Sequence, residues 1–216
     1  MKRPILIILL VLIADQALKI YIKTHFAIGE EYRIAPWFII HFTENNGMAF
    51  GMQFGGQAGK IVLSLFRIIV AVATGWYLRD ITIRKMHPGF IASIALIFAG
   101  AVGNIIDSAF YGLIFSDSGY YPAKFMAPGS GYAGFLHGKV VDMLYFPLIE
   151  GHFPSWFPFW GGEEFIFFRP VFNLSDASIS VGVALFLIFQ KKYYPSKPAT
   201  VTSPEASGNH PPDRPS

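Results

Sequence analysis

Four long apolar runs constrain the fold of this chain more than any other feature. They span about residues 4–21, 61–78, 90–111 and 171–189. Each run is close to the roughly 20 residues that cross a hydrocarbon core about 30 Å thick. Of the 216 residues, 53% are hydrophobic and only 14% are charged, so the apolar surface exceeds what a soluble domain of this size can bury. The sequence therefore predicts an all-α integral membrane protein with four transmembrane helices.

The basic residues predict how these helices are oriented. In a four-span arrangement they fall on one side of the membrane, at Lys2, Arg3, Arg79, Arg84, Lys85, Lys191 and Lys192. The positive-inside rule places that side and both termini in the cytoplasm. The long connections 23–60 and 112–170 then lie outside, and we expect them to form a small β-rich region that carries the function. The first run has the basic start of a signal peptide, but no cleavage site follows it, so we interpret it as an uncleaved span.

The absence or scarcity of certain residue types excludes several kinds of active site. The chain has no cysteine, which excludes a thiol nucleophile and a cysteine-ligated metal, and its six histidines do not form a His-Glu-x-x-His pattern. We therefore expect no metal and no cofactor. A net charge of +3 is too small to indicate a nucleic-acid partner. Residues 1–194 are predicted to form one four-span domain, and the Pro- and Ser-rich residues 195–216 are predicted to form a disordered cytoplasmic tail.

Charged side chains inside membrane helices are candidates for function, because lipid makes them costly. In the first span, Asp15 and Lys19 are spaced i,i+4 with the acid nearer the N-terminus. This order favours an ion pair on one face of the helix. We interpret this pair as structural, orienting the first helix against its neighbours.

The third and fourth spans share a second pattern, Asn-x-x-Asp, at Asn104 with Asp107 and at Asn173 with Asp176. The i,i+3 spacing places amide and carboxyl on one helical face, where the amide can donate a hydrogen bond to the acid or to a ligand. Hydrogen bonding between helices is the alternative role for the two asparagines. Periodicity alone would select Asp107 and Asp176 as the working pair.

The predicted outer connections add a third acid and a glycine-rich turn. Asp142 is the single carboxyl of an extended apolar stretch, residues 140–143. Residues 44–51 contain Gly47 and Gly51, which allow unusual backbone conformations and the close approach of a ligand. Taken alone, this segment is also consistent with an ordinary turn.

Together these motifs resemble those of the lipoprotein signal peptidases, the type II signal peptidases of bacteria. They are Asp-Gln-x-x-Lys, Asn-x-Gly-x-Ala-Phe, Gly-Asn-x-x-Asp, Val-Val-Asp and Phe-Asn-x-x-Asp, in that order, at residues 15–19, 45–50, 103–107, 140–142 and 172–176. The resemblance implies an aspartic endopeptidase of the bacterial cytoplasmic (inner) membrane. It implies removal of signal peptides from prolipoproteins, with cleavage before a cysteine that carries diacylglycerol. Prolipoproteins, membrane lipids and globomycin-like inhibitors are the implied partners.

The resemblance also implies roles for individual residues. It makes Asp142 and Asp176 the catalytic acids, and two carboxyls that share one proton can activate water while protonating a carbonyl. The residues that support or line such a site are implied to be Asn45, Gly47, Asn104, Asp107, Asn173, Asp15 and Lys19.

The sequence departs from the family pattern in two places. Ser108 stands where the family usually has arginine after Asp107, and Lys139 is a hypothetical substitute for that cation. The outer stretches 113–138 and 150–168 are longer than in compact relatives. The second stretch contains the aromatic segment 156–160, which we interpret as an interfacial anchor or a lid.

Two other function classes remain open from the residues alone. Lys60 and Ser64 share a helical face by i,i+4 spacing, as in a Ser-Lys peptidase. A proton-coupled transporter could use Asp15, Asp107 and Asp176 inside the membrane. The absence of visible repeat symmetry in the four spans disfavours the transporter.

Overall fold

The computed structural model describes residues 2–45 and 56–193, and within them four helices are long and apolar enough to cross a membrane. These are α1 (Lys2–His25), α2 (Gly56–Ile83), α3 (Pro88–Ile106) and α5 (Leu174–Tyr193). A π-helical segment, η2 (Asp107–Tyr111), and the short α4 (Gly112–Ile114) continue α3. The prediction of a four-helix membrane protein is confirmed. Gly47 and the tail 195–216 lie outside the described residues.

The outer surfaces of these helices are suited to lipid. Large apolar side chains on α1 and α2 are more than half exposed, including Leu6 at 58%, Ile13 at 65% and Ile69 at 66%. An apolar surface of this extent is typical of a membrane-facing protein and not of a soluble monomer.

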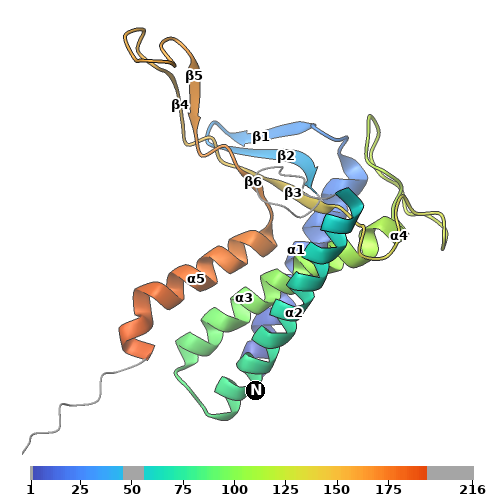
Figure 1. Ribbon diagram of the computed structural model, residues 1–216, viewed down its shortest axis with the longest axis vertical. Helices are drawn as coiled ribbons and strands as arrows, with labels where there is room; N and C mark the ends of the chain where they lie inside the picture. Colours follow the sequence, from blue (N-terminus) through green and yellow to red (C-terminus); the bar gives the residue numbers. More distant parts are fainter. Residues whose placement is uncertain (1, 46–55, 194–216) are drawn as a thin grey trace, which may run out of the picture.

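The connections between the helices supply the strands. β1 (Glu31–Ala35), β2 (Phe38–Asn45), β3 (Val140–Tyr145) and β6 (Val171–Phe172) form an antiparallel sheet in the order β1-β2-β3-β6. A separate hairpin pairs β4 (Ile149–His152) with β5 (Glu164–Phe167). The expected small β-rich region is therefore present. Figure 1 shows the sheet at one end of the helices, with the hairpin projecting beyond it.

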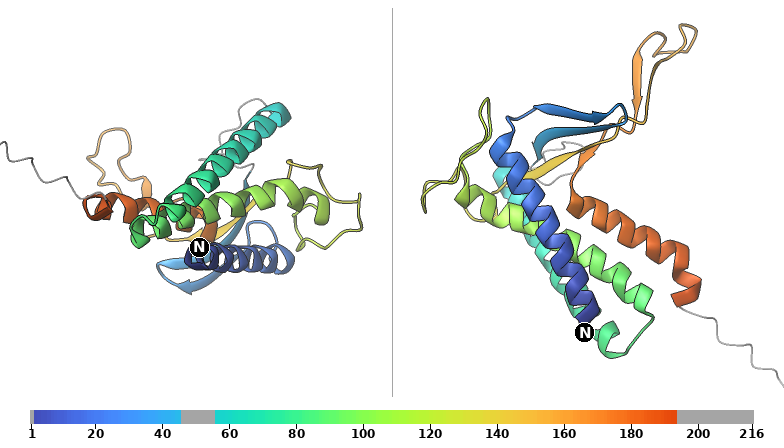
Figure 2. Two further views of the ribbon diagram at one scale, coloured as in Figure 1. Left: turned by 90° about the horizontal axis from the view of Figure 1, so that it is seen from below. Right: turned by 180° about the vertical axis from the view of Figure 1, so that it is seen from behind.

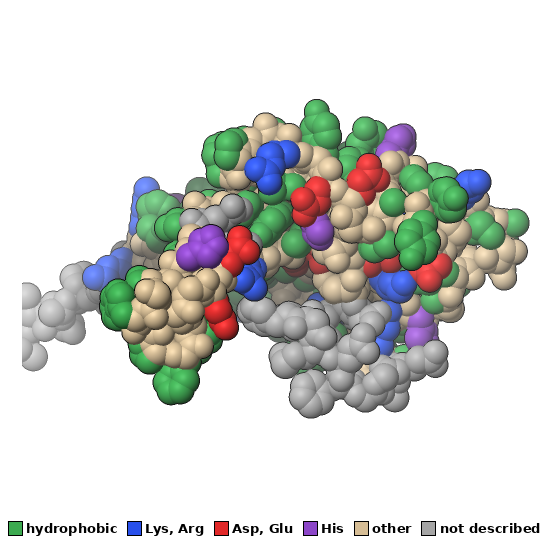
Figure 3. All heavy atoms as spheres, turned by 90° about the horizontal axis from the view of Figure 1, so that it is seen from above, with side chains coloured by type: hydrophobic (Ala, Val, Ile, Leu, Met, Phe, Trp, Pro, Cys, Tyr) green, Lys and Arg blue, Asp and Glu red, His purple; other side chains and the backbone are tan. Residues whose placement is uncertain are grey.

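The two ends of the molecule differ in what they carry. Figure 2 places the N-terminus and the turn between α2 and α3 at the end opposite the sheet, where α5 also ends. The end that carries the sheet presents side chains of both charges among hydrophobic ones (Figure 3). The connections predicted to lie outside the membrane thus gather at one end.

The fourth helix begins later than its apolar run suggests. The predicted span starts at residue 171, whereas Val171 and Phe172 pair with Tyr145 and Leu144 of β3. The helix begins only at Leu174. A short apolar strand directly before an apolar helix adds to the same run, so hydropathy cannot separate the two.

Close packing between α3 and α5 sets the position of the site. A Cβ atom at Gly103 would overlap with the Ser175 hydroxyl and lie 2.9 Å from a carboxylate oxygen of Asp15. A Cβ atom at Gly100 would overlap with the backbone of Ser175. Small residues allow membrane helices to approach this closely, so the start of α5 lies directly against α3 and α1.

Candidate active site

The start of α5 brings Asp176 close to the sheet. Asn173 caps this helix, because its side-chain oxygen accepts a hydrogen bond from the Asp176 backbone N–H at 3.0 Å. The Asp176 carboxylate reaches back to the Asn173 backbone N–H at 3.5 Å. These two contacts form a reciprocal capping box, with an aspartate in place of the usual glutamate. Asp176 is therefore held in the first turn, where the helix dipole favours a negative charge.

The same asparagine connects Asp176 to Asp142. The Asn173 amide nitrogen donates to Asp142 Oδ1 at 2.6 Å. Asp142 lies on β3, the strand that pairs with β6. The other Asp142 oxygen accepts a hydrogen bond from the Asn45 amide, on the neighbouring strand β2. Asp176 accepts a further bond from the Asn104 amide at 2.8 Å. The structure therefore brings together the two acids and three of the predicted supporting residues.

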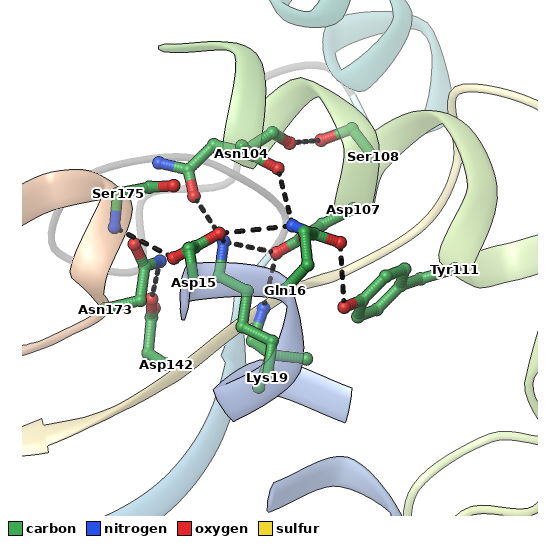
Figure 4. Close-up of polar contacts among 12 residues, drawn as sticks. Asp15, Gln16, Lys19, Asn104, Asp107, Ser108, Tyr111, Asp142, Asn173 and Ser175 are labelled. Carbon is green, nitrogen blue, oxygen red and sulfur yellow. Dashed lines mark hydrogen bonds and ion pairs between the residues drawn. The ribbon is translucent and has the colours of Figure 1, made fainter. Parts of the chain in front are cut away.

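A second group of acids surrounds Lys19. Its ammonium group lies 3.0 Å from Asp15 Oδ2 and 2.8 Å from Asp107 Oδ2, and all three side chains are fully buried. The predicted i,i+4 ion pair is present, with Asp107 as an additional partner. Figure 4 shows the three side chains meeting between α1 and the end of α3. A buried cation shared by two acids is a structural arrangement, because removal of any member leaves a buried charge unpaired.

Hydrogen bonds join the two groups of acids. Lys19 donates to the Asn104 side-chain oxygen at 2.9 Å, which turns the Asn104 amide nitrogen toward Asp176. Asp15 accepts the backbone N–H of Ser175 at 2.9 Å. Asp107 accepts a 3.3 Å bond from the Val141 backbone N–H, next to Asp142. The Lys19 group thus supports the elements that hold Asp142 and Asp176.

Sequence reasoning missed two participants, Gln16 and Tyr111. The Gln16 amide donates to Asp15 at 3.1 Å and to Asp107 at 2.9 Å, and the Tyr111 hydroxyl donates to Gln16 at 3.2 Å. Gln16 belongs to the Asp-Gln-x-x-Lys motif and could have been identified there. Tyr111 is one of many aromatic residues near the outer helix ends, and nothing in its sequence context distinguishes it.

Burial and a neighbouring charge set the protonation of the outer pair. Asp142 is only 3% exposed, and burial together with the nearby Asp176 carboxylate raises the pKa of Asp142 to about 7. The hydrogen bonds from Asn173 and Asn45 oppose this rise without cancelling it. Asp176 is partly exposed and accepts two N–H donors. At neutral pH one proton can therefore reside on the pair, with Asp142 holding it.

Lys139, the hypothetical substitute for the arginine, forms ion pairs with two other acids. Its ammonium group lies 2.7 Å from Asp117 and 3.6 Å from Glu44, and it also faces the Tyr132 ring. These partners belong to the connection after α4 and to β2.

The Ser-Lys arrangement also lacks the geometry that it requires. Lys60 donates to the His137 carbonyl at 2.7 Å, and Ser64 donates to the Leu136 carbonyl at 3.4 Å. Both side chains therefore attach α2 to the outer connection. Among residues 2–45 and 56–193, no group of three or more His, Cys, Asp or Glu side chains could hold a metal ion.

A four-span membrane protein with paired carboxylates at one end of its helices is the class that this fold and site define. A sequence model described as "Signal peptidase (SPase) II" matches residues 7–191 of the chain. The chain therefore belongs to the signal peptidase II family.

Similar proteins agree with this assignment. The chain is 51% identical to a lipoprotein signal peptidase of Porphyromonas gingivalis, over 84% of this chain and 80% of that protein. It is 36% identical to a lipoprotein signal peptidase of Amoebophilus asiaticus, over 84% of this chain and 75% of that protein. Two solved structures of bacterial membrane enzymes share the fold. Their TM-scores are 0.59 and 0.56, with 24% and 26% identity, covering 92% and 89% of this chain and 94% of each of theirs.

Proposed function

We propose that this chain is a membrane-embedded aspartic endopeptidase that removes signal peptides from diacylglyceryl-modified prolipoproteins. Cleavage falls before the lipidated cysteine, and Asp142 and Asp176 are the catalytic dyad. Membership of the signal peptidase II family supports the reaction class. The observation that carries the residue assignment is the Asn173 bridge, since this one residue contacts both carboxyl groups.

The two acids are suited to different tasks in peptide hydrolysis. Asp176, at a helix N-terminus with two N–H donors, is the ionised partner and takes a proton from the attacking water. Asp142, whose raised pKa of about 7 lets it carry a proton near neutral pH, donates that proton to the carbonyl oxygen of the scissile bond. Collapse of the tetrahedral intermediate then returns a hydroxyl proton to Asp142 and breaks the C–N bond, while the leaving amine takes its proton from Asp176.

The strand that carries Asp142 offers a place for the substrate backbone. β6 pairs with β3 at Leu144 and Tyr145, whereas residues 140–142 extend past this pairing toward the site. An extended substrate segment can lie along this edge and present its peptide bond to Asp142. Two helix-borne acids would provide no such edge. This favours Asp142 over Asp107 as the partner of Asp176.

The position of the site at the end of the helices fits a lipid-modified substrate. The diacyl chains of such a substrate stay in the bilayer while its cleavage site enters the site beside the sheet. The β4–β5 hairpin carries exposed aromatic residues, with Trp156 at 78% and Phe159 at 92%, and these are suited to the membrane interface. Globomycin-like inhibitors would occupy the same edge.

A direct assay tests this function. The purified chain should cleave a precursor peptide that bears a diacylglyceryl cysteine, and it should leave the unlipidated peptide intact. Asp142→Asn and Asp176→Asn should fold but fail to cleave. Normal cleavage by either variant would contradict the proposed dyad, and a transporter would cleave neither peptide.

The proposed location is the bacterial inner membrane, with both termini in the cytoplasm and the sheet end outside. Reporter fusions after Ile83 and after Ser130 should lie on opposite sides of the membrane. Fusions that report the same side would contradict this topology.

A further inference from the structure

Arg67 is an intramembrane cation that none of the roles above uses. It lies on α2 and is the only charged residue between positions 61 and 78. A charged side chain within a membrane span is costly and is usually kept for a function. Its side chain is partly buried in the structure, so it does not simply face lipid.

The packing of α2 defines where Arg67 points. Lys60, Ser64 and Arg67 follow each other at helical spacing and share one face of α2. Lys60 and Ser64 bind the carbonyl groups of His137 and Leu136. The next residue, Gly138, donates its backbone N–H to the Ser108 carbonyl at 2.8 Å. This face of α2 therefore lies against the segment that closes over the outer end of α3.

The register between α2 and α3 gives the depth of Arg67. The two helices pack against each other, and a Cβ atom at Gly75 would lie 2.9 Å from the Phe98 ring. The helices run in opposite directions, so moving eight residues from this contact, about 12 Å, brings Arg67 to the level of Ile106 and Asp107. That level is also the level of Asn104, which donates to Asp176. Arg67 thus lies at the depth of the carboxylate site.

Electrostatics agree with this placement. The carboxylates of Asp176, Asp142 and Asp107 are close enough to attract the Arg67 guanidinium. Asp107 is already paired with Lys19 at 2.8 Å. The charge of Arg67 therefore acts on both acids of the dyad.

We propose that Arg67 is a positioning residue whose positive charge holds the Asp142–Asp176 dyad in its singly ionised form. Two buried neighbouring carboxyl groups tend to remain neutral, because burial and mutual repulsion both oppose ionisation. A cation from α2 stabilises the first negative charge and leaves the second carboxyl protonated. This inference rests on the proposed aspartic mechanism.

The test compares pH profiles of kcat/KM for variants of the full chain. Arg67→Met removes the charge but keeps an apolar side chain of similar length, which suits a membrane helix. We expect the acid limb of its profile to move up by about one pH unit. Arg67→Lys should keep the limb near its parental position. Arg79→Met, at the exposed end of the same helix, is the matched control and should leave the profile unchanged.

The outcomes distinguish this inference from the function on which it rests. A uniform loss of activity in Arg67→Met without movement of the acid limb would overturn the inference. It would also be overturned if Arg67→Met and Arg67→Gln both failed to fold while Arg67→Lys folded, since the charge would then serve stability. If Asp142→Asn cleaved like the parent, the proposed dyad itself would fail.

A separate observation concerns the opposite end of the molecule. A cavity of about 510 Å³ lies between the start of α1 and the turn that joins α2 to α3. Three cations line it, Lys2, Arg3 and Lys85, and apolar side chains that include Ile7 and Ile91 form the rest of its wall. Among the described residues, none of these cations forms an ion pair with an acid.

We infer that this cavity binds one anionic phospholipid of the inner leaflet. Topology alone requires cations near helix ends, but it does not require three of them to converge on an apolar hollow. Basic pockets between membrane helices on the cytoplasmic side match a phosphate headgroup with its acyl chains below it. The charge and the apolar wall together fit a lipid better than a free anion.

Native mass spectrometry of the purified chain can test this site. Phosphatidylglycerol should bind about tenfold more tightly than phosphatidylcholine. The preference should disappear in Lys2→Gln/Arg3→Gln/Lys85→Gln and persist in Lys191→Gln/Lys192→Gln, whose cations lie at the end of α5. Equal binding of both lipids by the parent would overturn the inference. Competition by inorganic phosphate at the same concentration would also overturn it, since the site would then recognise a free anion.

Discussion

Two groups of acids lie side by side in this molecule, and they differ in the partners that hold them. Asp15 and Asp107 share the Lys19 ammonium group at 3.0 and 2.8 Å. Asp142 and Asp176 are held instead by the amides of asparagines. Asp15 and Asp107 face a fixed cation, whereas Asp142 and Asp176 accept hydrogen bonds from uncharged donors. The second group is therefore suited to proton transfer and the first to holding the helices together.

The contrast also explains why two similar motifs serve different purposes. Asp107 and Asp176 both follow an asparagine by three residues, but only Asp107 faces Lys19 on α1. Asp176 lies at a helix start, where Asn173 joins it to β3. The role of each acid is thus set by the element packed against it and not by its own motif.

The largest expected effect is loss of turnover when Asp142 or Asp176, the acids held by asparagine amides, is replaced. Asp142→Asn or Asp176→Asn should lower kcat by about 10³-fold, because each removes one proton-transfer step while keeping shape and hydrogen bonding. The double variant should be little worse than either single one, since the two acids act as a unit. Cleavage of a lipidated precursor measures the loss.

Asp107→Asn is the matched control for that experiment. It changes an acid of the same motif in the ion-paired group, so we expect reduced stability with measurable cleavage. An inactive Asp107→Asn protein beside an active Asp142→Asn protein would reverse the assignment of the two groups.

The next largest effect is a loss of stability when the ion pairs of Lys19 with Asp15 and Asp107 are broken. Lys19→Met leaves two buried carboxylates without their cation, which should cost about 3–5 kcal/mol of unfolding free energy. Asp15→Asn should cost less, because Asp107 still pairs with Lys19. Thermal unfolding in detergent measures both, with the exposed Lys191→Met as control. A stable but inactive Asp15→Asn protein would move Asp15 into the catalytic group.

The close contact between α3 and α5 at Gly103 is a third target. Gly103→Ala places a methyl group against the Ser175 hydroxyl and Asp15, so these side chains or α5 must shift. Overpacking of this kind typically costs about 1–3 kcal/mol. Gly119→Ala is the control, since a Cβ atom there meets nothing within 4 Å. Equal unfolding temperatures for the two variants would show that this close approach is not required.

The sequence predicted the helices and the acids better than the way in which they meet. Hydropathy identifies four spans because lipid imposes a length on each apolar run. Periodicity relates residues only within one helix, so it could not bring Asp142 to Asp176; that pairing came from the family resemblance. It depends on Val171 and Phe172 joining β3 just before the cap at Asn173. Sequence alone also could not show that Lys139 pairs with Asp117 and Glu44, which lie far from it along the chain.

The smallest effect, and the finest comparison of the two groups, is the dependence on pH. Burial and the Asp176 charge raise the pKa of Asp142 to about 7, so the proton that it donates is lost as pH rises through that value. kcat/KM should then fall by about tenfold per pH unit above the limb, and Asp107→Asn should leave the limb in place.

Stability should follow the same proton, which gives a readout independent of activity. A pKa raised above its unfolded value of about 3.9 means that the folded chain binds the proton more tightly. The stability contributed by Asp142 is therefore complete below pH 4 and declines until pH 7. Asp142→Asn, which cannot ionise, should flatten the unfolding temperature across this range relative to the parent. If the unfolding temperature of this variant still fell with pH as it does in the parent, another group would hold the titrating proton. Asp142 and Asp176 would then not differ from Asp15 and Asp107 in the proposed way.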